Sequence, residues 1–164
     1  MPFLESLDAL LALRNEGKIR HIGLSNVSTI QLEEALRRTP VVSVQNLFNV
    51  DGGAGRLARF SGSIVDDPEA VLDGCTARGI AFIPFFPLGM GALAQRRATI
   101  AAIAKRHRAT SAQVAIAWLL ARSPMMLPIP GTRSIAHLEE NWAARRIALS
   151  PTEVAAIARP SEPA

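Results

Sequence analysis

The feature that most constrains the fold is a strand, a short polar loop and a capped helix in immediate succession around HIGLSN, residues 21–26. The apolar residues before the loop predict a strand over Arg20–Leu24. After the loop, Ser28 and Gln31 form a capping box that predicts a helix over Thr29–Arg38. Such a succession defines a βα unit, and parallel βα proteins bind ligands at the carboxyl ends of their strands.

The same alternation continues along the rest of the chain, where Thr110 and Gln113 form a second capping box. Strands are predicted over residues 41–44, 80–83 and 125–129, and helices over residues 3–16, 67–78, 98–107, 111–122, 135–146 and a short segment that opens at residue 150. Residues 50–67 are glycine-rich and aperiodic, so a long loop is expected there. The alternation predicts an α/β protein with a parallel sheet. Composition does not change along the chain, so we expect a single domain over residues 1–164.

Three stretches of this pattern resemble the aldo-keto reductase family. They are EGKIRHIGLSNVSTIQLEEAL at residues 16–36, GIAFIPFFPLGMGAL at residues 79–93 and LPIPGTRSIAHLEENWAA at residues 127–144. The resemblance implies an α/β fold in the form of a partial TIM (β/α)8 barrel, comprising roughly strands five to eight with their helices. A chain of 164 residues is too short for a closed barrel, which needs about 250 residues.

The resemblance implies a nicotinamide nucleotide, NADP(H), as cofactor. Ser25, Asn26 and Gln45 match the family's contacts to the nicotinamide carboxamide, for which hydroxyl and amide side chains are suitable partners. The alternative for Ser25 and Asn26 is a simple turn before a capped helix. Phe85 matches the aromatic ring that lies against the nicotinamide, and its alternative is a core aromatic. Asn46 is expected to belong to a loop.

Further matches cover the remaining parts of the dinucleotide. The family's pyrophosphate loop corresponds to Phe86, Leu88 and Gly89, the site for the adenosine end to Gly131, Thr132 and Arg133, and the adenine contacts to Glu140 and Asn141. Within this set, Arg133 is the candidate for the 2′-phosphate, because a guanidinium binds phosphate bidentately. Many members carry a lysine at the position of Gly131 and an arginine at that of His137, so the choice of NADPH over NADH is supported only in part.

The resemblance supplies no catalytic residue in this chain. Family catalysis uses an aspartate, a tyrosine, a lysine and a histidine from the first half of the barrel, and this sequence contains no tyrosine. We therefore expect an oxidoreductase fragment that binds its cofactor but does not reduce a carbonyl by itself. The alternatives are a non-catalytic nucleotide-binding or protein-interaction module and a structural relic without a ligand.

Open strand edges of such a half-barrel are expected to pair with other chains. Self-association is the prediction, with binding of a separately made first half and poor folding as the alternatives. A formal charge of +4 without a basic, aromatic-lined stripe argues against nucleic acid. An apolar run of about 20 residues, which a membrane span requires, is missing from the sequence. The single cysteine and the absence of a signal-peptide pattern favour the cytoplasm.

Two other sequence patterns do not support a different site. GAGRLA at residues 53–58 fits G-x-G-x-x-A, but a dinucleotide fingerprint joins a strand directly to a helix, and here a polar segment intervenes. The histidines at residues 21, 107 and 137 lack the spacing of metal ligands, so no metal site is predicted.

Overall fold

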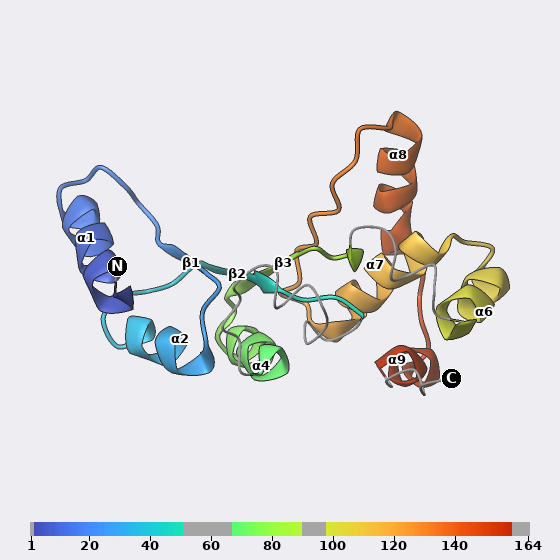
Figure 1. The fold of residues 1–164 in the computed structure, drawn as a ribbon, viewed down its shortest axis with the longest axis horizontal. Helices are drawn as coiled ribbons and strands as arrows, with labels where there is room; N and C mark the ends of the chain where they lie inside the picture. Colours follow the sequence, from blue (N-terminus) through green and yellow to red (C-terminus); the bar gives the residue numbers. More distant parts are fainter. Residues whose placement is uncertain (1, 51–66, 90–97, 159–164) are drawn as a thin grey trace.

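The computed structural model describes residues 2–50, 67–89 and 98–158. Its centre is a three-stranded parallel sheet in the order β1 (Gly23–Ser25), β2 (Ser43–Leu47) and β3 (Ala81–Phe85). Figure 1 shows helices along one side of the strands, with one upright helix to the left of the strands and another to their right. The predicted parallel α/β architecture is confirmed for these residues.

The helices follow the order expected from the sequence. They are α1 (Phe3–Asn15), α2 (Thr29–Leu36), α4 (Pro68–Arg78), α6 (Ala98–His107), α7 (Ser111–Arg122), α8 (Ile135–Ala143) and α9 (Pro151–Ala158), with a 3-10 turn η2 (Ala144–Arg146) after α8. Both predicted capping boxes are present, at Ser28 and at Thr110. Asp67 caps α4, and Gly79 ends it in the left-handed conformation that glycine adopts without strain. The predicted loop over residues 50–67 lies almost entirely outside the described residues.

The predicted strand over residues 125–129 is wrong in the described part of the chain. Only Met126 pairs with β3, as an isolated parallel bridge to Phe82. The Phe82 N–H donates to the Met125 carbonyl at 2.8 Å, and the Leu127 N–H donates to the Phe82 carbonyl at 2.8 Å. The next bond of this parallel ladder would run from the residue 84 N–H to the Leu127 carbonyl, and Pro84 of β3 has no N–H to donate.

Several predicted boundaries also differ from the structure. The first strand covers residues 23–25 instead of 20–24, and the second covers 43–47 instead of 41–44. The third strand covers residues 81–85 instead of 80–83, the second helix ends at residue 36 instead of 38, and α8 ends at residue 143 before η2. These shifts arise because the sequence only weakly determines where a helix or strand begins and ends.

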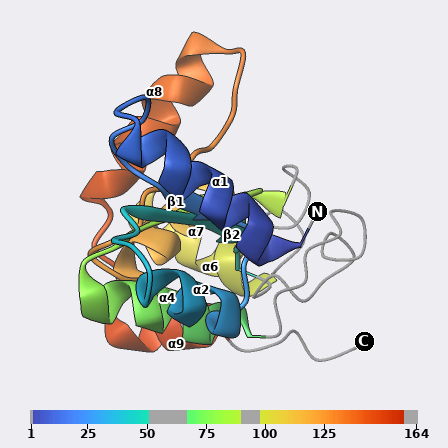
Figure 2. The ribbon, with the colours of Figure 1, turned by 90° about the vertical axis from the view of Figure 1, so that its left-hand side faces the viewer.

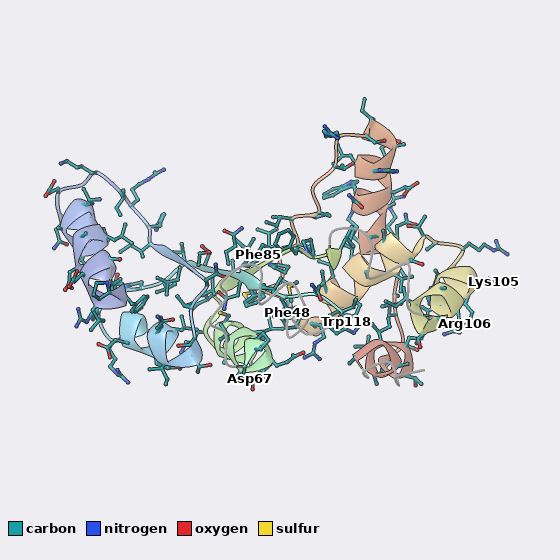
Figure 3. All side chains as sticks on the ribbon, in the orientation of Figure 1. Phe48, Asp67, Phe85, Lys105, Arg106 and Trp118 are labelled. Carbon is teal, nitrogen blue, oxygen red and sulfur yellow. The ribbon has the colours of Figure 1, made fainter. Side chains whose placement is uncertain are left out.

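The core lies between the sheet and the helices on one of its faces. Leu24, Val44 and Phe82 are buried from successive strands, whereas their neighbours along each strand are more exposed. The Phe48 ring stacks on Trp118 at 6.0 Å between centroids and meets Phe82 edge-on at 5.7 Å (Figure 3). This aromatic cluster joins the sheet to α7. The opposite face of the sheet is therefore the one left for contacts outside the core.

The last helix is attached to α6 through one carboxylate. Glu153 accepts hydrogen bonds from the Arg106 guanidinium at 3.0 Å and pairs with the His107 ring at 3.1 Å. The Ser150 N–H also donates to Glu153 at 2.9 Å. The backbone hydrogen bond from Ser150 and the bonds from His107 and Arg106 lower the pKa of Glu153 to about 2, from an ordinary value of 4.5.

Replacing this carboxylate should change the pH dependence of stability. The folded pKa of Glu153 lies below its unfolded value, so its contribution is present above about pH 4.5 and is lost as the pH falls toward 2. Glu153→Gln should therefore lower the free energy of unfolding at pH 7 by about 1–2 kcal/mol. The deficit should shrink as the pH approaches 2 in urea titrations. The matched control is Glu139→Gln, which changes an exposed carboxylate on α8; an equal deficit in both variants would contradict the assignment.

Candidate cofactor site

A cleft with a volume of about 810 Å³ lies between the end of β3, the start of α7 and α8. We call it the α7–α8 cleft. Phe86, Leu88, Gly131, Thr132, Glu140 and Asn141 are the predicted cofactor residues that line it. The structure thus brings together residues from segments that are far apart in the sequence, as the assignment to the pyrophosphate and adenosine ends requires.

The N-terminus of α7 forms one wall of this cleft through Thr110, Ser111 and Ala112. The Gln113 N–H donates to the Thr110 hydroxyl at 3.2 Å, and the Thr110 N–H donates to the Gln113 side chain at 2.9 Å. Gln113 also donates to the Glu140 carbonyl at 3.0 Å, which joins the two helices that frame the cleft. The first N–H groups of a helix have no intrahelical acceptor, so this wall suits an anion.

Sequence reasoning missed this wall, although it identified the capping box. By itself, the capping box predicts only the start of a helix. Nothing in the local sequence indicates that this helix begins beside the loop at residues 129–132. The wall could have been predicted by combining two signals, the capped start of this helix and the end of the strand that follows it in the chain.

The loop before α8 forms the opposite wall. The Ser134 N–H donates to the Thr132 hydroxyl at 3.1 Å, and the His137 N–H donates to the Ser134 hydroxyl at 3.4 Å. The Thr132 side chain therefore orders the entry into α8. His137 lines the cleft, whereas the exposed Arg133 does not.

The end of β3 carries a turn with an unusual backbone. Phe86 has a φ of 51°, in the left-handed region that bulky residues rarely adopt. Its carbonyl accepts from the Gly89 N–H at 2.9 Å and from the Asn49 side chain at 3.2 Å. Phe85 lies at the last position of the strand (Figure 3), with its ring 5.5 Å from that of Phe86. Two donors thus hold a strained turn at a strand end, where strain in proteins often accompanies function.

The predicted nicotinamide residues lie at the end of β1, at the centre of β2 and at the end of β3. Ser25 and Gln45 are partners in the parallel register, and Phe85 is the partner of Leu47. The Asn26 N–H donates to the Gln45 carbonyl at 3.0 Å, and Asn26 has a φ of 53°. These residues therefore follow the same end of the sheet.

They do not, however, line the α7–α8 cleft. Ser25 and Asn26 line a separate cleft of about 370 Å³ between α1, β1 and the start of α2. The predicted site therefore extends along the ends of the strands, and it is not contained in one cavity.

Asn46 corrects an expectation, since it lies inside β2 and is fully buried instead of belonging to a loop. Its side chain accepts from the Val27 N–H at 3.1 Å and donates to the Val27 carbonyl at 2.8 Å. This pair of bonds fixes the loop that carries Ser25 and Asn26. Sequence reasoning missed the role because its partner lies 19 residues away.

Among residues 2–50, 67–89 and 98–158, no group of three or more histidine, cysteine, aspartate or glutamate side chains could hold a metal ion. In the same ranges, the helices are too short or too polar to cross a membrane.

The parallel sheet, its helices and the clefts beside the strands define a parallel α/β protein. The sequence profile of the Aldo/keto reductase family matches residues 1–162, and the chain belongs to that family. It is 43% identical to an uncharacterized oxidoreductase of Schizosaccharomyces pombe, over 92% of this chain and 45% of the relative. It is also 43% identical to pyridoxine 4-dehydrogenase of Escherichia coli, over 88% of this chain and 46% of the relative. The chain thus spans about half the length of these relatives.

Solved structures agree with this assignment. A thermostable aldo-keto reductase in complex with the inhibitor epalrestat matches with a TM-score of 0.76 and 32% identity, over 96% of this chain and 54% of the other. An aldo-keto reductase from Klebsiella pneumoniae, in complex with NADPH, matches with a TM-score of 0.73 and 28% identity, over 99% of this chain and 56% of the other.

Removing the Asn46 side chain should loosen the loop between β1 and α2. In Asn46→Leu, the buried N–H and carbonyl of Val27 lose their partners, and each unpaired group costs about 1–3 kcal/mol. We expect the free energy of unfolding in urea to fall by about 2–5 kcal/mol. Asn15→Leu, at an exposed asparagine of α1, should change it by less than about 0.5 kcal/mol. Equal stability of the two variants would show that the Asn46 bonds do not hold the loop.

Proposed function

We propose that this chain is the NADP(H)-binding part of an aldo-keto reductase, folded as a single domain over residues 1–164 that forms roughly strands five to eight of a (β/α)8 barrel. The observation that carries the proposal is the α7–α8 cleft, where a capped helix N-terminus faces predicted cofactor residues from two other segments. Membership of an oxidoreductase family, with a similar protein solved in complex with NADPH, supports the same cofactor.

The residues of the cleft fit the phosphate and adenosine parts of the nucleotide. The N–H groups at the start of α7 suit phosphate oxygens, since they lack intrahelical acceptors. A side-chain carbon built on Gly131 would meet no atom within 4 Å, so the backbone there is open to close approach by a ligand. Glu140 and Asn141 provide an acceptor and an amide for the edge of adenine.

The nicotinamide end of the cofactor would reach along the strand ends toward β1. Neighbouring parallel strands lie about 4.8 Å apart, so Ser25 on β1 is about 10 Å from β3, across β2. In this arrangement Phe85 covers one ring face, and Ser25, Asn26 and Gln45 orient the carboxamide. When bound, NADPH supplies the hydride for reduction of a carbonyl to an alcohol; the residues of this chain bind and orient it.

The chain by itself is proposed to be inactive in carbonyl reduction. The sequence contains no tyrosine, and hydride transfer to a carbonyl requires a proton donor at the oxygen. The second candidate is therefore a non-catalytic module that only binds the nucleotide, which the same absence favours. We also place the protein in the cytoplasm, because its one cysteine, Cys75, is buried and unpaired.

Arg133 follows Thr132 of the cleft lining and is exposed outside it, where we propose that its guanidinium binds the 2′-phosphate, so Arg133→Ala should weaken binding of NADPH selectively. A charge-assisted hydrogen bond to the 2′-phosphate contributes about 1.5–3 kcal/mol, which corresponds to about a 10- to 100-fold increase in Kd. The measurement is fluorescence titration of the purified chain with NADPH and, separately, with NADH, for which little change is expected. Arg20→Ala is the matched control, since this exposed arginine precedes β1 at the opposite end of the strand. An equal loss of affinity for NADPH and NADH would overturn the role of Arg133.

The purified chain should show no aldehyde-dependent oxidation of NADPH. The expected result is a constant NADPH absorbance with a panel of aldehydes, measured beside full-length E. coli pyridoxine 4-dehydrogenase as the reference enzyme. Turnover by this chain would show that the absent proton donor is dispensable. Failure to bind either nucleotide would instead favour a relic without a ligand.

A further inference from the structure

The side-chain amide of Gln113 joins the start of α7 to α8. Its Oε1 accepts a hydrogen bond from the Thr110 N–H at 2.9 Å, which completes the cap of α7. Its Nε2 donates to the Glu140 carbonyl at 3.0 Å, across 27 residues of the chain. That carbonyl also accepts from the Ala144 N–H, so the bond from Gln113 uses its second lone pair and does not disturb the helix. One polar side chain therefore connects the two helices.

The bond to α8 is not a requirement of the cap. Ser28 and Gln31 form the same capping box at the start of α2, with distances of 2.9 and 3.2 Å. Within the described residues, the Gln31 side chain makes no hydrogen bond to another helix. Glutamate completes such a box as glutamine does, because the box needs only an acceptor at this position. The NH2 group, which glutamate lacks, is the part of Gln113 that reaches α8.

Other attachments of α8 are weak. No residue of this helix is buried, and Figure 1 and Figure 2 show it projecting beyond the other helices. Among the hydrogen bonds of the described residues, the bond from Gln113 is the one that joins α8 to a segment distant in the sequence. A segment with few buried apolar contacts has a low local stability. Loss of this one bond should therefore change where α8 lies relative to α7.

The two helices carry the two walls of the α7–α8 cleft that a nucleotide would contact. Thr110, Ser111 and Ala112 form the α7 wall, and Glu140 and Asn141 form the α8 wall. Gln113 is not among the described residues that line the cleft, so its influence on a ligand passes through these walls. In the proposed binding mode the phosphate groups lie at the α7 wall and adenine lies at the α8 wall. The ligand must therefore reach both walls at once.

We propose that Gln113 is a positioning residue that fixes the distance between the α7 wall and the α8 wall. This inference rests on the proposed function. A change in that distance affects only ligands that contact both walls. ADP carries both groups, whereas pyrophosphate contacts the α7 wall alone and adenosine contacts the α8 wall alone. ADP also lacks the 2′-phosphate, so its binding does not depend on the role of Arg133.

Two variants of the full chain remove the donor to α8 with opposite side effects. Gln113→Met stays uncharged but loses the acceptor of the cap, whereas Gln113→Glu keeps that acceptor and adds a charge. The change they share is the loss of the bond to Glu140. By isothermal titration calorimetry, the Kd of ADP should rise about 3- to 10-fold in both, as expected for one hydrogen bond. In Gln113→Met, the Kd of pyrophosphate and that of adenosine should stay unchanged.

Gln31→Met is the matched control, because it makes the same substitution in the other capping box, on a helix that does not line the α7–α8 cleft. It should leave the Kd of ADP unchanged. An unaltered Kd of ADP in both Gln113 variants would overturn the positioning role. An equal rise for ADP and pyrophosphate in Gln113→Met would also overturn it, since the effect would then lie in the cap of α7. Failure of the unmodified chain to bind ADP would instead refute the cofactor proposal, and this inference with it.

Discussion

A parallel sheet covered by helices on one face only is the constraint on which the rest of the molecule depends. Parallel sheets are normally buried on both faces. Here Leu24, Val44 and Phe82 fix one face against the helices, and the aromatic contact between Phe48 and Trp118 extends that packing to α7. The other face and both edges are left for contacts that the described residues do not supply. The strand ends collect polar groups for the same reason, because parallel strands all end on one side.

Residues that shape the candidate site also stabilise the fold. Gln113 completes the cap of α7 and also bonds to the Glu140 carbonyl, so the capping residue sets the width of the α7–α8 cleft. Asn46 stabilises β2 and at the same time orders the loop that carries the predicted nicotinamide contacts. Positions of this kind join folding to ligand binding, because the atoms that shape the cleft also satisfy buried backbone groups.

The sequence predicted the order of the elements and the capping boxes well, since these depend on neighbouring residues. The helices over residues 98–107 and 111–122 were predicted with the bounds that the structure shows. The sequence did not predict that the last strand is reduced to one bridge beside Pro84, or that Asn46 is buried and hydrogen-bonded. These outcomes depend on contacts between distant segments. The division of the predicted site between two clefts also depends on the packing of distant segments, because Ser25 and Gly131 line different clefts.

Pro128, beside the Met126 bridge, also affects how molecules of this chain associate at high concentration. Exposed strand edges invite open-ended growth, in which each molecule adds to the next and fibres result. Met125 and Leu127 direct their backbone groups toward β3, so Pro128 lies on the outer side, where it presents a carbonyl and no N–H. Two edges that both lack N–H donors cannot pair with each other, and proline at a strand edge is a common protection of this type. Pro128 therefore opposes open-ended association at this edge of the sheet.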